Sequence, residues 1–422
     1  MKIEPMVLQD FCKEFGYEKD VEEQIESVWD MTLTEGVGKD ITFLNMDFCR
    51  KYYPLTQGDP AVMDRLEEVC RIAAENPAVV LWAWLVHYNT FLRKPSCKYI
   101  NLPLPEKILG ENAGILQLIC AMSCLPLIEE THQKRNIPRT YFEQSAQWLK
   151  GTMQIYAAAH NGVPGFTLEQ IPWMRFSVDG TLFRIGRLEY FLHPYPNWLP
   201  LIYRNRKDGS IKVLCRKDAQ YKKADGTSLD PDMKEEDIFT AKLIQLDHKV
   251  TGTPIAPDGY ALVNETVTLD LDEWECAASP WDLVPSLHIP GGGGMTPDSI
   301  KASLTDAYEF FKTYFQAEIK IFPCISWILN PLWKTEMPDS NMTKFMLEGF
   351  QAPVPGNGCG NHGLFFLFGR ADGDPQTYPA TTSMQKTVQR ILREGKYLRC
   401  GIVFFCTDKL EHYGTQYYRN HC

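Results

Sequence analysis

Residues 285–311 read PSLHIPGGGGMTPDSIKASLTDAYEFF, and this stretch decides the fold of the second half of the chain. An apolar strand is expected to end at His288, and four consecutive glycines, Gly291 to Gly294, follow it closely. Apolar residues then recur at intervals of three and four, which predicts a helix with Thr296 as N-cap and Pro297 as first helical residue. The stretch therefore predicts a strand, a bare backbone loop and a capped helix in direct succession.

The four glycines predict a phosphate or pyrophosphate site. Each glycine loses much conformational entropy on folding, and a turn requires only one or two glycines, so four in a row suggest another role. Bare glycines let ligand oxygens reach backbone amides at the positive end of a helix. A turn without a ligand is the alternative, and Asp298 favours it because a carboxylate in the first turn repels an anion. No Lys follows the glycines, which disfavours a Walker-type loop, and a dinucleotide-binding loop would be expected earlier in a parallel sheet.

Composition restricts the class of protein. The 422 residues suggest two or three domains, and a hydrophobic fraction of 44% allows large cores. A net charge of −10 argues against binding to nucleic acid through its phosphates. The longest apolar runs are shorter than the roughly 20 residues that span a bilayer, so no membrane association is expected. The 13 cysteines lack C-x-x-C pairs, which predicts reduced thiols in a cytoplasmic protein.

The chain divides into two expected domains of different class. Residues 1–165 carry helical periodicity and predict an all-helical domain. Residues 166–422 are strand-rich over 171–290 and alternate between strand and helix over 283–410. The predicted fold class is therefore α+β or α/β, with an all-helical N-terminal domain followed by a mixed β-sheet flanked by helices.

Local signals refine the second domain. Asp179-Gly180 and Asp208-Gly209 predict hairpin turns, and the polar residues 216–237 predict a solvated loop or insertion. Strands are expected at 282–290, 319–329, 362–370 and 397–407, and helices at 296–315, 340–350 and 381–395.

This order of strands, glycine loop, helix, strand, short helix, strand, helix and strand resembles the GNAT fold of N-acyltransferases. In that family the loop after the fourth strand follows the pattern Q/R-x-x-G-x-G/A and binds the pyrophosphate of an acyl-CoA. Residues 288–293, HIPGGG, match both glycines, with His288 in the Q/R place. The next strand, CISWIL, would splay from its neighbour to admit the pantetheine arm. The resemblance implies an acyl-CoA co-substrate bound by Ile289, Gly291, Gly292, Gly293, Gly294, Met295, Thr296, Ser326 and Asn330.

Taken together, the motifs of both halves of the chain indicate a more specific resemblance. The helical N-terminal half, FRIGRLEYF, the glycine stretch, CISWIL and DSNMTKF closely resemble bacterial two-domain acyltransferase-like proteins. These proteins pair an N-acyltransferase N-terminal domain with a GNAT-like C-terminal domain, which implies acyl transfer to a small-molecule amine. The frequent catalytic Tyr before the family's Gly-Phe, here Gly349 and Phe350, has no match, and Phe345 and Met346 stand near that place. A non-catalytic acyl-CoA-binding or sensor protein is therefore the alternative.

Two residues are candidates for the catalytic base. His288 ends a strand beside the glycines, and the usual pKa of a histidine suits a base near neutrality. A structural hydrogen bond is the alternative role for this residue. Glu189 is the carboxylate candidate, but strand alternation puts it on one face with Arg187, which suggests an ion pair. Cys324 lacks a visible base and reads as a core residue. No metal site is expected, because Cys359 and His362 are two ligands without further partners.

Overall fold

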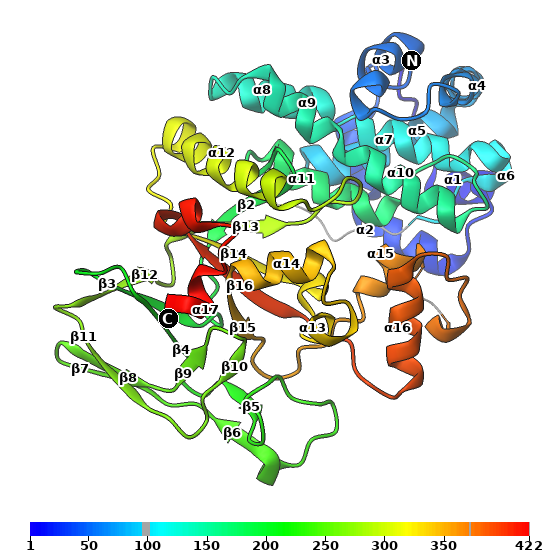
Figure 1. Cartoon of the computed structure of the whole chain (residues 1–422). Helices are drawn as coiled ribbons and strands as arrows, with labels where there is room; N and C mark the ends of the chain where they lie inside the picture. The colour runs from blue at the N-terminus through cyan, green and yellow to red at the C-terminus, as the bar shows by residue number, and fades with distance from the viewer. Residues whose placement is uncertain (95–101, 371–372, 422) are drawn as a thin grey trace. The chain divides into compact units, whose positions relative to one another are not determined.

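The computed structural model describes residues 1–94, 102–370 and 373–421. The chain forms two compact units, Met1–Arg184 and Ile185–Cys422 (Figure 1). The first unit is helical, as the periodicity predicted. Helical structure continues to Val178, so the expected domain boundary at residue 165 lies before the last helices of this unit.

Two apolar helices form the centre of the first unit. Every residue of α5 (Pro77–His87) after Pro77 is buried, and so is every residue of α7 (Ala113–Met122). Asn76 caps α5 because its side chain accepts the backbone N–H groups of Ala78 and Val79, and Pro77 stands at the first helical position. The other helices of the unit are α1 (Leu8–Phe15), α2 (Lys19–Gly36), α3 (Met46–Tyr52), α4 (Val62–Glu75), α6 (Glu106–Leu109), α8 (Leu125–Lys134), α9 (Arg139–Ala146), α10 (Trp148–Ala159) and α11 (Met174–Val178).

One helical run is longer than the sequence analysis expected. Residues Glu106–Lys134, which include α6, α7 and α8, are long and apolar enough to cross a membrane. The most apolar window of this run is 78% buried inside the protein. The expectation that every apolar run is too short was therefore wrong, and the burial is that of a core helix.

A six-stranded mixed sheet forms the centre of the second unit, in the order β1-β2-β13-β14-β16-β15. β13 is antiparallel to β2 and parallel to β14, and β16 is antiparallel to both β14 and β15. The helix α12 (Pro297–Phe315) connects the parallel pair, as predicted. The strands are β1 (Leu182–Ile185), β2 (Leu188–Pro194), β13 (Leu283–His288), β14 (Ile321–Ser326), β15 (Phe350–Pro353) and β16 (Gly401–Cys406).

Two helices cover one face of this sheet. Cross-strand pairs run from Tyr190 on β2 across the sheet to Gln351 on β15, so both side chains lie on the same face. Tyr190 shares a 2.9 Å hydrogen bond with Ser303 of α12, and Gln351 donates to the carbonyl of Met346 on α14 (Asn341–Glu348) at 2.9 Å. α12 and α14 therefore lie on this common face.

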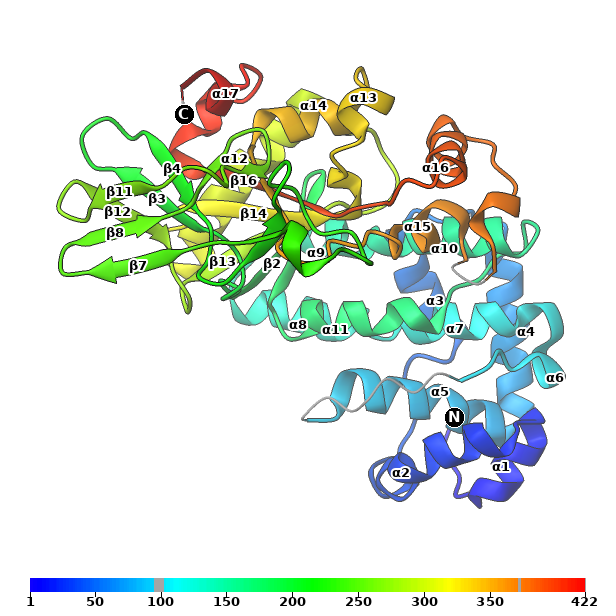
Figure 2. The same ribbon diagram turned by 90° about the horizontal axis from the view of Figure 1, so that it is seen from below.

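The opposite face packs against a second sheet, of order β10-β9-β4-β3-β12. Ile202, Val213 and Ile255 from this sheet share one core with Ile402 and Phe404. The strands are β3 (Leu201–Asn205), β4 (Ile211–Leu214), β9 (Pro254–Ala256), β10 (Tyr260–Ala261) and β12 (Trp274–Ala278). Figures 1 and 2 show a third, three-stranded sheet, formed by β7 (Leu243–Leu246), β8 (Lys249–Gly252) and β11 (Val267–Asp270).

The remaining elements test the local predictions. Asp208-Gly209 does connect an antiparallel hairpin, β3–β4. The polar stretch 216–237 is more ordered than a solvated loop, because it contains β5 (Gln220–Lys222), which pairs with β6 (Ile238–Thr240) and buries Tyr221. The remaining helices are α13 (Trp333–Glu336), α15 (Gly363–Phe368), α16 (Ser383–Arg393) and α17 (Tyr417–His421).

Two predictions of local structure were wrong. Residues 362–370, predicted as a strand, contain the helix α15, because a short run of consecutive apolar residues has no period that separates helix from strand. Asp179-Gly180 is not a hairpin turn but follows the end of α11, where Gly180 has a φ of +71°. The residues between β1 and β2 are instead Gly186 and Arg187.

Candidate active site

The glycine loop joins β13 to α12, as the sequence predicted. Gly292 and Gly293 have φ angles of +76° and +68°, in the left-handed region that glycine tolerates best. The Oγ1 atom of Thr296 accepts the N–H of Ser299 at 3.4 Å, so the predicted N-cap is confirmed. All four glycines are exposed, whereas Met295, which follows them, is buried.

The backbone amides of this loop are unpaired in the part of the chain that the structure describes. Within the described ranges, the N–H groups of Gly291 through Met295 donate to no backbone or side-chain oxygen. Unpaired N–H groups that precede a helix N-terminus are the donors that anionic ligands use. The loop therefore has the donor set that a diphosphate requires.

The carbonyl groups of the same loop are bound by one side chain. Arg187 donates from Nη1 to the carbonyl of Pro290 at 2.9 Å, from Nε to that of Gly294 at 3.1 Å and from Nη2 to that of Gly293 at 3.3 Å. Strand alternation predicts that Arg187 lies within a strand, on one face with Glu189. It lies instead in the turn before β2, where its guanidinium reaches the loop.

The two predicted catalytic residues lie together. His288 on β13 and Glu189 on β2 are directly opposite each other in the antiparallel ladder, so their side chains share a face. Glu189 is 4% exposed. Burial, followed by the charge of the nearby His193, lowers the pKa of His288 to about 4. His288 is therefore neutral near pH 7, but it is a weak base.

A second histidine on this face was missed by the sequence analysis. The Nδ1 atom of His193 lies 2.8 Å from the carbonyl oxygen of Pro194, which can only accept, so Nδ1 carries the proton of the neutral ring. Nε2 then accepts the hydroxyl of Ser286, at 2.6 Å. Burial lowers the pKa of His193 as well, which favours this neutral form. Period-two alternation from Glu189 would have placed His193 on this face, but only the strand pairing brings Ser286 to it.

The aromatic ring of Phe191 links the two histidines. Its centroid lies 4.9 Å from the ring of His193 and 6.3 Å from the ring of His288. In the ladder Phe191 is opposite Ser286. Besides Phe191, this face of the β2–β13 pair carries four groups that can accept or donate a proton: Glu189, His193, Ser286 and His288.

The predicted residues on and after β14 differ in their surroundings. Cys324 is fully buried, and burial raises the pKa of its thiol to about 12, which agrees with a core role. Ser326 Oγ accepts the N–H of Ile328 at 3.2 Å and caps a single helical turn, η6 (Trp327–Leu329). Asn330 is 1% exposed, and its Oδ1 accepts the N–H of Leu332. Its Nδ2 has no hydrogen-bond partner among the described residues.

The strands β13 and β14 are paired over a short length. Only Leu287 and Cys324 are in register between them, whereas β13 pairs with β2 along all six of its residues. Beyond this pair, the backbone groups on the facing edges of the two strands do not continue the ladder. The splaying of CISWIL from its neighbour, which the resemblance implies at this place, stays a prediction.

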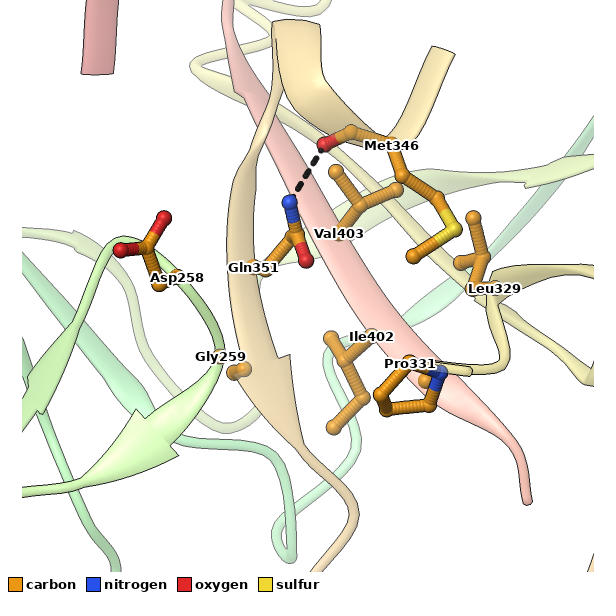
Figure 3. A pocket seen from close by; sticks show the side chains of 10 residues that line it. Asp258, Gly259, Leu329, Pro331, Met346, Gln351, Ile402 and Val403 are labelled. Atoms are coloured by element: carbon orange, nitrogen blue, oxygen red, sulfur yellow. Dashed lines mark hydrogen bonds between the residues drawn. The ribbon is translucent and has the colours of Figure 1, made fainter. Parts of the chain in front are cut away.

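A small pocket opens at the same end of the sheet (Figure 3). Leu329 and Pro331, on either side of Asn330, line it. Figure 3 shows Gln351 bound to the carbonyl of Met346 at the wall of this pocket. Ser326 and Gly401 are opposite each other in the ladder, which places the pocket near the carboxyl end of β14.

No metal centre is visible in the described part of the chain. Within residues 1–94, 102–370 and 373–421, no group of three or more His, Cys, Asp or Glu side chains could hold a metal ion. His362 Nε2 lies 3.8 Å from the sulfur of Cys400, and these two side chains are fewer than the three that such a group requires.

Comparisons with known proteins place the chain in a family. A family model described as GNAT-like C-terminal domain matches residues 182–404, which is more than half of the chain. The chain belongs to this GNAT-like family. The resemblance and the fold class inferred from the sequence are thereby confirmed. A search of curated proteins gave no match.

Solved structures share the fold of nearly the whole chain. An acyltransferase crystallised with decanoyl-CoA and teicoplanin has a TM-score of 0.61 at 17% sequence identity, over 95% of this chain and 100% of that one. An acyltransferase crystallised with CoA and 10C-teicoplanin has a TM-score of 0.62 at 16% identity, with the same coverage. These similarities extend the shared fold beyond the GNAT-like domain to the helical unit.

Proposed function

We propose that this GNAT-like protein is an acyl-CoA-dependent acyltransferase that transfers the acyl group to a small-molecule amine. The observation that carries the proposal is the set of unpaired amides from Gly291 to Met295, at the start of α12 and next to the short β13–β14 pairing. The amides are suited to the diphosphate of CoA, and we propose that the pantetheine arm lies along the strand edges beyond the short β13–β14 pairing.

Two further features support this ligand. The proteins of similar fold were crystallised with CoA, octanoyl-CoA or decanoyl-CoA, and two of them also with teicoplanin or its 10C form as a second molecule. The unpaired Nδ2 of the buried Asn330 is a donor that an amide carbonyl of pantetheine would satisfy. Ser326, Ile289 and Thr296 remain proposed contacts.

We propose that the catalytic base is one of the side chains on the shared face of β2 and β13. An ammonium must lose a proton before its nitrogen can attack the thioester carbonyl, and the CoA thiolate must gain one. His193 suits the first step, since its unprotonated Nε2 accepts the hydroxyl of Ser286 and can receive the ammonium proton through that hydroxyl, while Nδ1 is held by its hydrogen bond to Pro194. His288 and Glu189, the residues chosen from the sequence, lie beside it on the same face. His193 is less buried than either, so it is the first choice.

A binding protein without turnover is the second candidate. Phe345 and Met346, near the place of the family's catalytic Tyr, are each 1% exposed and carry no proton donor for a leaving thiolate. We also propose a reducing, cytoplasmic location, because the described cysteines form no disulfide bond.

Thiol release separates the two candidates. We expect the purified protein to release CoA from acetyl-, octanoyl- or decanoyl-CoA when a panel of primary amines is added. His193→Gln is expected to lower kcat by roughly 100-fold or more, the usual contribution of a general base, with little change in CoA affinity. The matched variant His248→Gln changes an exposed histidine and is expected to leave kcat unchanged. Binding of acyl-CoA without release for any amine would support the sensor, and absence of binding would refute both.

A further inference from the structure

The clearest unexplained contact in the second unit is that between Arg187 and the glycine loop. One guanidinium donates to three loop carbonyls, those of Pro290, Gly293 and Gly294. Arg offers five donors in a rigid planar fork, so one side chain can bind several oxygens in fixed directions. A lysine in this position would present a single point charge.

These bonds engage the carbonyl groups of the loop and leave its N–H groups unpaired. An anion near the loop is repelled by carbonyl oxygens and attracted by N–H groups. Because three carbonyls are directed to the guanidinium, they are not available to face an anion. The amides from Gly291 to Met295 are left as the unpaired groups of the loop.

The turn that carries Arg187 is anchored to α12. Ser303 Oγ donates to the carbonyl of Ile185 at 2.5 Å and accepts the N–H of Leu188 at 3.3 Å. The Tyr190 hydroxyl donates to the same oxygen, at 2.9 Å, so the buried Ser303 uses its donor and both lone pairs.

Gly186 makes this close approach feasible. Its φ is +59°, and a Cβ at this position would lie 3.4 Å from the Cβ of Ser303. The hairpin turn therefore lies directly against α12, and Arg187 has a fixed position relative to the start of the same helix.

We propose that Arg187 is the positioning residue of the diphosphate loop, and that it makes the site selective for a thioester carrying a diphosphate. The inference rests on the proposed function. Arg187 acts through the loop backbone: it orients the carbonyls of the loop and adds a positive charge behind the amides. Thioesters that lack the diphosphate, such as an S-acyl pantetheine, gain nothing from this arrangement.

The experiment compares two ligands on the same variants. Calorimetric titrations with CoA and with pantetheine are made on wild type, Arg187→Ala and Arg187→Lys. Loss of several charge-assisted hydrogen bonds is expected to weaken CoA binding about 10-fold or more in Arg187→Ala, while pantetheine affinity stays within about 2-fold. Arg187→Lys keeps the charge but not the fork, so its CoA affinity is expected to stay closer to that of Arg187→Ala than to wild type.

A charge-matched control excludes a general field effect. Lys301 lies on α12, and its Nζ donates to another backbone carbonyl, that of Glu411, at 2.9 Å. Lys301→Ala removes one positive charge from the same helix and is expected to bind CoA within about 2-fold of wild type. Ser303→Ala loosens the hairpin turn without removing a charge and is expected to weaken CoA binding by a smaller factor than Arg187→Ala.

Steady-state kinetics supply the second readout. In Arg187→Ala the KM for acyl-CoA is expected to rise while kcat changes by less than about 3-fold, because a positioning residue of the diphosphate acts on binding. Equal losses for CoA and pantetheine, or wild-type CoA affinity in Arg187→Ala, would overturn the inference and leave the proposed function standing. A wild-type protein that binds no CoA overturns both.

Discussion

At the scale of residues, Gly292 and Gly293 keep different sides of the loop free of side chains. Gly292 and Gly293 both have a positive φ, but their surroundings differ. A Cβ at Gly293 would lie 3.8 Å from Nε of Arg187, whereas one at Gly292 would meet no atom within 4 Å. A side chain at Gly292 would therefore stand in the open space next to the unpaired amides. A side chain at Gly293 would instead lie on the Arg187 side of the loop.

Gly292→Val is expected to weaken CoA binding strongly by blocking close approach of the diphosphate. Gly395→Val is the matched control, because Gly395 has a φ of +69° and a Cβ there would also meet no atom within 4 Å. Both variants are expected to lose stability on the order of 1–2 kcal/mol from the left-handed backbone. Only Gly292→Val should lose affinity in a calorimetric titration with CoA. Equal CoA affinities in the two variants would contradict the proposed ligand.

At the scale of elements, the end of β14 depends on close backbone contact with β16. Gly401 begins β16, and a Cβ there would lie 2.2 Å from the carbonyl oxygen of Leu329. Leu329 ends the single turn that Ser326 caps, and Asn330 follows it directly. The absence of a side chain at Gly401 therefore sets the position of the segment that carries the unpaired amide of Asn330.

Gly401→Ala is expected to destabilise the protein by roughly 1–3 kcal/mol, because the backbone of Leu329 must move. Gly294→Ala is the control, since its nearest contact, at 3.8 Å to Thr296, is an ordinary one and its φ is not positive. That substitution is expected to leave the free energy of unfolding unchanged or raise it by about 0.4–1 kcal/mol. Urea unfolding of both variants provides the measurement, and equal midpoints would refute the close contact.

At the scale of the whole molecule, buried histidines link stability to pH. Burial lowers the pKa of His87 to about 3 and that of His132 to about 4, and the exposed fractions of these residues are 7% and 1%. His87 Nδ1 lies 2.7 Å from Ser123 Oγ, whereas neither ring nitrogen of His132 has a partner among the described residues. His132 lies instead near the rings of Phe142 and Phe183.

The sign of the effect follows from the direction of these shifts. In the unfolded chain a histidine has a pKa of about 6.5, above both folded values, so the unfolded state binds more protons between the two. The stability contributed by the neutral rings is present above about pH 6.5 and is lost as the pH falls towards 4. Each group changes the free energy of unfolding by roughly 1.4 kcal/mol per pH unit in that window.

His132→Phe is expected to remove one such contribution. Phe is apolar and aromatic, which suits a site with two phenylalanine neighbours and no hydrogen bond to the ring. The difference in unfolding free energy between pH 7 and pH 5, measured by urea titration, should be smaller in the variant by about 2 kcal/mol. An identical pH dependence in wild type and variant would show that His132 does not titrate between pH 5 and 7 on unfolding.

Much of the fold was readable from local pattern. The strand, the glycine loop, the cap at Thr296 and the long helix α12 were predicted because periodicity and capping are properties of neighbouring residues. The helix α15 was misread for the same reason, since its apolar run has no period. The length of the core run Glu106–Lys134 was underestimated because it is made of successive shorter helices.

The sequence by itself determined the fold class, the family and the place of the glycine loop, because these depend on the order of elements along the chain. Only the tertiary structure decided which side chains serve that loop. Arg187 and Gly294 are 107 positions apart, and His193 and Ser286 are 93 apart. Their contacts arise from strand register and from the docking of a hairpin turn on α12. No local period records these relations, because they are set by packing between segments distant in the chain.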